Sequence, residues 1–315
     1  MKTIPLLWFA ISIALGLSLA AQAGPKETTT LAPEKSAPLP IHTIEGVGGL
    51  VITPIAYLVN PGPAGTIIGL PSISTTFVSA GEKDLETVAL TETFFGRVEL
   101  GYGVSRLGIG TLGDDVKEIT TIALADYVVL HNFNARLLAL PENSFDLPLP
   151  AVVIGASYKY NDGISKMNRQ LGGVLNSIGY RCNEGMDFTL TASKQFPIFR
   201  RSLLLTAGLR LSEGEQLGYF GFGDKYRTTF ESNVAYSIVD WLWLAAEFRG
   251  NANAYQQIAN PKGGALVDRV DNWWALGATV LLSRHATVTV GWGHLGPIIN
   301  TTENECLGIQ VKYEF

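Results

Sequence analysis

The chain has 315 residues, of which only 16% are charged, against about 25% in ordinary soluble domains. A pI near 5.5 and a formal net charge of −5 argue against nucleic acid as a partner. The mean hydropathy is +0.20, yet no apolar stretch beyond the first 23 residues reaches the roughly 20 residues that a membrane-spanning helix needs. An apolar chain without such a helix can still be accommodated in a bilayer as a closed β-barrel.

The first 23 residues have the features of a secretory signal peptide. Lys2 provides a positive start, residues 4–20 form an almost unbroken apolar run, and Ala21-Gln22-Ala23 supplies a small-x-small cleavage pattern. We therefore expect the mature chain to begin at Gly24, the alternative being an uncleaved anchor. Because no cysteine follows the apolar run, lipid attachment at a mature N-terminal cysteine is excluded.

Two segments are expected between the signal peptide and the barrel. Residues 24–45, rich in Pro, Thr, Glu and Lys up to Pro40, are typical of a disordered periplasmic leader. Residues 46–65 are apolar and glycine-rich, and Pro54 in their middle argues against a paired central strand. We interpret residues 46–65 as a segment ahead of the barrel that can fold into the lumen as a plug.

Residues 66–315 consist of short runs in which apolar residues alternate with small or polar ones, the pattern of half-buried β-strands. The last run is the clearest, since every odd residue from Leu307 to Phe315 is apolar. The same alternation recurs in residues 98–105, 152–160 and 286–293. Aliphatic residues dominate the middle of the apolar face and aromatic residues its ends, as in a lipid-facing band with aromatic girdles. The sequence therefore predicts an all-β fold, a transmembrane antiparallel up-and-down β-barrel.

We place twelve strands in this barrel, within a range of ten to fourteen. The connections mostly alternate between long and short, as expected for external loops and periplasmic turns, and an even number puts both barrel ends in the periplasm. Two connections fit less well, a long turn at 140–150 and a short external gap at 81–84. The expected strands are 72–80, 85–94, 97–108, 128–140, 151–161, 186–195, 202–213, 226–238, 241–250, 270–282, 285–294 and 305–315.

The C-terminal residues Val311-Lys312-Tyr313-Glu314-Phe315 resemble the terminal signature of outer-membrane barrels, which the barrel assembly machinery reads during biogenesis. This resemblance implies that Phe315 and Tyr313 form the assembly signal. It also implies the outer membrane as the location, with its lipid as a surrounding partner.

The chain as a whole is similar to an uncharacterised bacterial family of outer-membrane barrels. The similarity depends on residues 46–54 (GVGGLVITP), on residues 203–210, and on residues 216–224 (QLGYFGFGD). The opening segment is also loosely similar to barrels associated with exopolysaccharide production. None of these motifs is a catalytic signature, so the resemblance implies no functional residue.

The sequence offers no catalytic, cofactor-binding or metal-binding constellation, and we expect no enzyme and no cofactor. An outer-membrane phospholipase needs a serine two positions after a histidine, and none of His42, His131, His285 and His294 has one. Asp126 and His131 are five residues apart, which places them on opposite faces of one strand. No two histidines have a metal-ligand spacing.

The charges that strand parity directs inward are the candidate functional residues. A midplane Arg or Lys facing lipid would cost roughly 2–4 kcal/mol, so these side chains are expected to line the lumen. One interpretation is a pore lining of mixed sign, and the other is a network of salt bridges that fills a narrow lumen. The same parity places Trp241 and Trp243 inside unless a bulge intervenes. The expected lumen-lining residues are Glu99, Arg136, Lys159, Arg210, Arg227, Glu231, Glu247, Arg249, Lys312 and Glu314.

These features favour a channel or facilitator for a small solute, with the apolar segment 46–65 as plug or gate. The alternative is a non-transporting structural or assembly barrel linked to envelope or exopolysaccharide production. The sequence does not identify the solute. Cys182 and Cys306 are both expected toward the external side, about half a circumference apart, as two separate thiols unless the 162–185 loop folds across the mouth.

Overall fold

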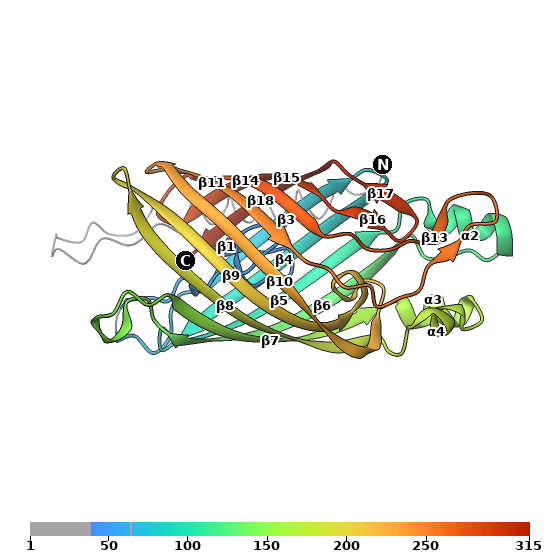
Figure 1. Ribbon diagram of the computed structural model, residues 1–315, viewed down its shortest axis with the longest axis horizontal. Coiled ribbons are helices and arrows are strands. Elements are labelled where there is room, and N and C mark those ends of the chain that lie inside the picture. Colours follow the sequence, from blue (N-terminus) through green and yellow to red (C-terminus); the bar gives the residue numbers. More distant parts are fainter. Residues whose placement is uncertain (1–38, 64) are drawn as a thin grey trace.

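The computed structural model describes residues 39–63 and 65–315, and the expected signal peptide lies outside the described residues. Within the described part of the chain, twelve antiparallel strands close into one barrel (Figure 1), in which β18 pairs with β3. The barrel strands are β3 (Ser72–Ala80), β4 (Lys83–Phe94), β5 (Val98–Gly108), β6 (Tyr127–Leu140), β7 (Ala151–Asp162), β8 (Glu184–Ile198), β9 (Arg201–Gly214), β10 (Phe222–Val239), β11 (Leu242–Arg249), β14 (Trp273–Leu281), β15 (Ala286–His294) and β18 (Cys306–Glu314).

The predicted barrel is confirmed, and all twelve expected strands are present with ends that differ by at most four residues. The inward and outward faces follow the expected parity. On β15, for example, Thr289 is 3% exposed and donates to or accepts from the Thr279 hydroxyl across the lumen face, whereas Val290 is 51% exposed. Outward aliphatic residues face the lipid because the bilayer is their lowest-energy surrounding.

The two ends of the barrel differ in their connections. At one end the turns are short, such as Phe95–Arg97 and Phe199–Arg200, although the β6–β7 connection contains the 3-10 helix η1 (Ser144–Asp146). At the other end the connections are long, except for the turn at 81–82. By the rule for outer-membrane barrels, the short-turn end faces the periplasm and the long-loop end faces outward. None of the helices in the described ranges is long and apolar enough to cross a membrane.

The long connections fold over the external mouth, to the right in Figure 1. Their apolar side chains pack into one buried cluster that also includes Ile44 and Ile52 from inside the barrel. The elements in these connections are α2 (Leu112–Thr120), α3 (Ile164–Gln170), α4 (Val174–Ile178), η2 (Glu215–Gly218), the β12–β13 pair (Ile258–Ala259 and Ala265–Val267) and the β16–β17 pair (Gly296–Ile298 and Thr301–Glu303).

Residues 39–60, which we call the inner segment, lie inside the barrel. They contain one short antiparallel pair, β1 (Ile41–His42) and β2 (Gly48–Gly49), and then continue as turns around Pro54. Residues 40–45 were expected in the disordered leader, but they are buried here and His42 is fully enclosed. The expected boundary at 45–46 is therefore wrong, because the ordered segment begins several residues earlier than the change in composition suggests.

Two glycines of β5 allow the inner segment to approach the wall. A Cβ at Gly103 would lie 2.9 Å from the carbonyl oxygen of Glu45, and one at Gly101 would lie 3.2 Å from that of Gly46. Gly46 itself has a φ of +80°, which a side chain rarely adopts. The lumen-facing glycines of this strand therefore make room for the backbone that fills the barrel.

Both cysteines lie on the long-loop side and are free. Cys182 precedes β8, and Cys306 begins β18, six positions away in the ring of strands. The expected arrangement of two separate thiols is confirmed.

Candidate functional site: the buried charge network of the lumen

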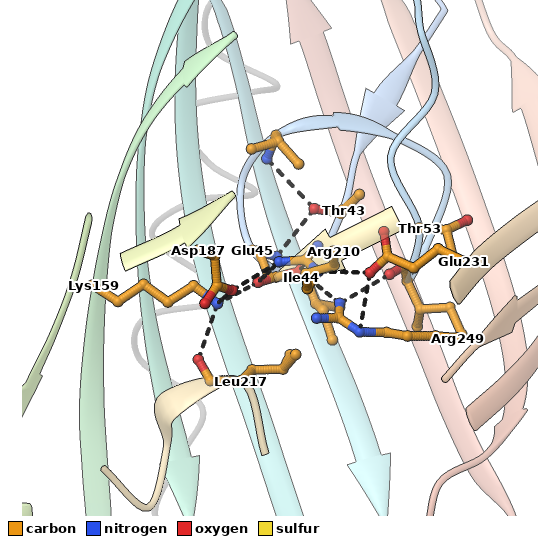
Figure 2. Close-up of polar contacts among 12 residues, drawn as sticks. Thr43, Ile44, Glu45, Thr53, Lys159, Asp187, Arg210, Leu217, Glu231 and Arg249 are labelled. Atoms are coloured by element: carbon orange, nitrogen blue, oxygen red, sulfur yellow. Dashed lines mark hydrogen bonds and ion pairs between the residues drawn. The ribbon is translucent and has the colours of Figure 1, made fainter. Parts of the chain in front are cut away.

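The centre of the lumen holds a compact cluster of three carboxylates and three cations. Glu45 of the inner segment contacts one cation from each of β7, β9 and β11, and Figure 2 shows it between them. Its Oε1 lies 2.6 Å from Lys159 Nζ, and its Oε2 lies 3.0 Å from Arg210 Nη2 and 2.6 Å from Arg249 Nη1.

The remaining two carboxylates come from the barrel wall. Asp187 of β8 lies 2.6 Å from Lys159 Nζ and 2.9 Å from Arg210 Nη1, and Glu231 of β10 lies 2.6 Å from Arg210 Nε. Every side chain of the cluster is at most 5% exposed. Three positive and three negative charges thus neutralise one another, which buried charges require.

Glu45 is ionised in this cluster. Burial alone would raise the pKa of its carboxyl group, but the Arg210, Arg249 and Lys159 charges together hold that pKa well below its usual range. The inner segment is therefore tied to the wall by a fixed negative charge.

The cluster also reaches the loop above it. Lys159 Nζ donates to the carbonyl oxygen of Leu217 at 3.1 Å, and the Asn161 amide donates to the carbonyl oxygens of Gly218 and Tyr219. Residues 215–221 are all buried, so the β9–β10 connection descends into the mouth of the barrel. Lys159 therefore links the inner segment to an external loop.

A second contact joins the inner segment to Glu247 of β11. The backbone N–H groups of Val51, Ile52 and Thr53 donate to its carboxylate at 2.8, 2.9 and 2.8 Å, and the Thr53 hydroxyl donates at 2.7 Å. Successive backbone N–H groups that converge in this way form an anion-binding concavity. Glu247 thus holds the turn of the inner segment without a cation.

A third contact involves Glu99 of β5 and Arg136 of β6. Their side chains form an ion pair of 3.0 Å, and Glu99 also accepts the N–H groups of Gly48 and Val59. Arg136 donates to the carbonyl oxygen of Ile55. The ion pair therefore accepts hydrogen bonds from backbone N–H groups of the inner segment and donates to a backbone carbonyl group.

The first residues of the inner segment bind the strands next to the β18–β3 junction. Lys312 Nζ donates to the carbonyl oxygen of Pro40 at 2.6 Å and also pairs with Glu314. The Gln310 amide exchanges two hydrogen bonds with the His42 backbone. Side chains around the ring thus hold the inner segment, which does not add a strand to the barrel sheet.

The structure places nine of the ten expected lumen residues inside, each at most 4% exposed. Arg227 also borders the lumen, beside Arg210 and Arg249, but it lies near the external mouth, where it is half-buried and its guanidinium donates to the Lys225 carbonyl oxygen. Arg210, Lys159, Arg249 and Glu231 come together in the central cluster. Glu99, Arg136, Glu247 and Lys312 hold the inner segment at separate points of the wall, and Glu314 pairs with Lys312.

Two members of the cluster were missed in the sequence. Glu45 was expected in the leader, because the composition of residues 24–45 gives no sign that this carboxylate binds the cations of the wall. Asp187 lies at the start of the expected strand 186–195, where it alternates with Phe188 and Leu190. The period-2 pattern alone would have directed Asp187 inward.

Cavities remain on both sides of the inner segment. One of about 470 Å³ lies at the short-turn end, where Leu50 and Ile55 face Trp243 and Ala245 of β11. A smaller one of about 60 Å³ lies toward the external loops, between Ile44 and Ile52 and the strands β3, β4, β14, β15 and β18. Trp243 does point inward, as its parity predicts. The lumen accommodates this apolar side chain because it packs against Leu50 and Ile55 of the inner segment.

The described residues include one histidine–serine contact of the kind that hydrolases use. His42 Nδ1 lies 2.7 Å from Ser74 Oγ, but its Nε2 lies 2.9 Å from the Thr91 hydroxyl instead of a carboxylate. A catalytic triad needs a carboxylate to orient the imidazole. Both side chains are also buried, His42 within the inner segment and Ser74 on the β3 wall that this segment covers. Within residues 39–63 and 65–315, no three His, Cys, Asp or Glu side chains are grouped to hold a metal ion.

A model of a protein family matches residues 40–312, which include all but the first residue of the inner segment and nearly the whole barrel. The chain belongs to the family described as protein of unknown function (DUF3034). The expected membership of an uncharacterised outer-membrane barrel family is thus confirmed. No curated protein sequence matches the chain significantly.

The closed twelve-stranded barrel with its outward aliphatic face is an outer-membrane barrel. Solved structures with a similar fold include other barrels of the outer membrane. The KdgM porin is 11% identical, with a TM-score of 0.48, covering 78% of this chain and 99% of its own. The COG4313 outer membrane channel from Pseudomonas putida F1 is 11% identical, with a TM-score of 0.41 and coverage of 81% and 97%. The outer membrane phospholipase A from Escherichia coli is 10% identical, with a TM-score of 0.35 and coverage of 80% and 98%. Likenesses this distant concern the fold and do not identify a solute or a reaction.

Proposed function

We propose that this protein is a channel or facilitator for a small solute and that the inner segment is its plug. The observation that supports this most directly is the position of Glu45. The inner segment supplies one of the three carboxylates that neutralise Lys159, Arg210 and Arg249, so its docking depends on ion pairs with the wall.

The mode of attachment supports a removable plug. Side chains of the wall bind the inner segment, whereas the barrel closes by its own ladder between β18 and β3. The barrel fold therefore does not require the segment. Its departure would leave a lumen lined by charged and polar side chains that water can hydrate.

The cavities support a solute of low polarity. Both border apolar residues of the inner segment, among them Leu50, Ile52 and Ile55. Water-filled porin lumens are polar, so apolar space in line with the plug favours a weakly polar or hydrophobic solute over an ion.

A non-transporting structural barrel is the second candidate. The completeness of the charge pairing favours it, because a fully neutralised, buried network also holds a static plug permanently. The two functions differ in one property, whether the inner segment leaves the lumen in the folded protein.

Conductance in planar bilayers tests the proposal. The mature chain 24–315 and a shortened chain 61–315 would be compared, each checked for the heat-dependent gel migration of a closed barrel. We expect rare openings in the first and a persistent conductance in the second. A shortened barrel that is folded but electrically silent would contradict the plug.

A further inference from the structure

The external loops enclose a third cavity, separate from the two that border the inner segment. It has a volume of about 220 Å³ and lies between the connections 109–126, 163–183 and 250–272. Val116 of α2, Met167 of α3, Leu175 of α4 and Val267 of β13 line it, together with Phe220 and Ile299 from the two connections nearest the lumen.

The side chains of this cavity offer no free polar group. The two hydroxyls among them are already used, since Thr120 donates to the carbonyl oxygen of Val116 and Tyr255 donates to that of Phe220. What remains is aliphatic surface, the rings of Phe220 and Tyr255, and the Met167 thioether. Aromatic rings pack favourably against both other rings and thioether sulfur.

The volume suits a molecule with one or two rings. An apolar cavity of roughly 150 Å³ in another protein accommodates benzene, so about 220 Å³ leaves room for a substituent or a second ring. The cavity is also accessible from outside, because the lining residues Ile119 and Val174 are 36% and 46% exposed.

The external cavity adjoins the small cavity above the inner segment. Two pairs of consecutive residues separate them: Phe220 and Ile299 line the external cavity, and Tyr219 and Ile298 line the inner one. Residues 219–220 and 298–299 thus form a thin wall that is shared by the two cavities. An apolar solute that moves from the external cavity toward the lumen would next contact another apolar surface.

We propose that the external cavity is the entry site of the channel and binds a small aromatic hydrocarbon or a similarly apolar aromatic molecule. This inference names the solute class of the proposed function and rests on it for the transport step. Binding itself does not depend on movement of the inner segment, so the two proposals can fail separately.

Methionine methyl NMR tests the binding. The sequence has methionines at 1, 167 and 186, and Met1 lies in the expected signal peptide, so the processed protein should give two signals. Met167 lines the cavity, whereas Met186 is on the outward parity of β8. With naphthalene as the probe, we expect a saturable shift of the Met167 signal. Met186 should show only the linear drift that comes from partition into the detergent or lipid.

A bulky residue in the cavity should abolish the shift. Leu171 and Ile258 are half-buried lining residues, so Leu171→Trp and, independently, Ile258→Trp should weaken naphthalene binding about tenfold or more. Leu282→Trp is the matched control at the opposite end of the barrel and should leave the affinity unchanged. Heat-dependent migration shows which variants are assembled.

Either of two results would overturn the entry site: a Met167 signal that does not saturate, or full affinity in an assembled cavity-filling variant. Neither result would affect the conductance difference between the chains 24–315 and 61–315. Conversely, a silent shortened barrel that still binds naphthalene would contradict the plug and leave the binding site standing.

Discussion

Replacement of Glu45 by glutamine should open the channel without unfolding the barrel. The substitution keeps the size of the side chain and changes the central cluster from neutral to one net positive charge. Removal of one partner from a buried ion pair typically costs about 3–5 kcal/mol. Because Glu45 belongs to the inner segment and the strands close without it, most of this cost should fall on docking of the segment. At 1.4 kcal/mol per factor of ten, the ratio of docked to undocked molecules should fall roughly 10²- to 10⁴-fold.

Single-channel recording measures this ratio as the open probability at fixed voltage. Asp187→Asn is the matched control, since it removes one carboxylate from the same cluster and also leaves one net positive charge. Asp187 is on β8 and pairs with Lys159 and Arg210, which are both wall residues. Its loss leaves Glu45 as the carboxylate partner of Lys159 and as one of two carboxylate partners of Arg210, so the open probability should stay at the wild-type level or decrease.

The comparison separates three explanations. An increase confined to Glu45→Gln supports docking by this carboxylate. Equal increases in both variants would mean that the net charge loosens the barrel as a whole, which refutes the specific role of Glu45. Unchanged conductance in an assembled Glu45→Gln protein would show that these ion pairs do not keep the lumen closed.

Three further outcomes are expected. Val290→Arg should lower the free energy of unfolding in lipid by roughly 2–4 kcal/mol if the residue lies near the bilayer midplane, whereas Val290→Leu should stay close to wild type. If the two variants were equally stable to urea, the outward face of β15 would not contact lipid. Phe315→Ser should reduce the amount of assembled protein in outer-membrane fractions but leave its heat resistance intact, because the resemblance implies a role in recognition; normal levels would count against an assembly signal. Burial raises the pKa of Glu215 to about 7 although two backbone N–H groups, of Ala254 and Tyr255, donate to it. The protonated Glu215 carboxyl group therefore stabilises the fold fully below pH about 4.5, and this contribution is lost as the pH rises through about 7. The backbone amides near residues 254–255 should accordingly be less protected from hydrogen exchange at pH 8 than at pH 5. Glu215→Gln should remove that difference, and a persistent pH dependence would exclude this carboxyl group as its source.

The strands were predictable because lipid and lumen impose opposite demands on alternate residues. Strand β4 has no clean alternation in the sequence, because Glu86 has the same parity as Leu90. The structure explains the mixture: Leu85 and Ala89 point inward toward the small apolar cavity and the inner segment, so the inner face is itself partly apolar. Glu86 points outward near the external rim, 3.9 Å from Arg106. Alternation fades where the lumen is filled by apolar protein.

The inner segment shows the limit of reasoning from local composition. Residues 40–45 follow a polar, proline-rich stretch and contain no long apolar run, so an average over neighbours assigns them to the leader. Their order comes from the wall, which encloses His42 and Glu45 with side chains from strands distant in the sequence. Lys159, Arg210 and Arg249 are 114, 165 and 204 residues away from Glu45. No local pattern records such a contact.

A charge count, however, contains part of this information. The ten residues expected in the lumen include six cations and four carboxylates, an excess of two positive charges. Arg227 is half-buried near the mouth, so the nine buried residues comprise five cations and four carboxylates. A buried lumen cannot keep even this excess of one positive charge without neutralisation. The structure supplies two further carboxylates, Glu45 from the inner segment and Asp187 from β8. The imbalance of the expected lining therefore indicates that at least one acidic group is missing from it. Among the described residues, Asp187 of the wall and Glu45 of the inner segment are the two further carboxylates that contact these cations, and only Asp187 lies on a strand where alternation could have located it.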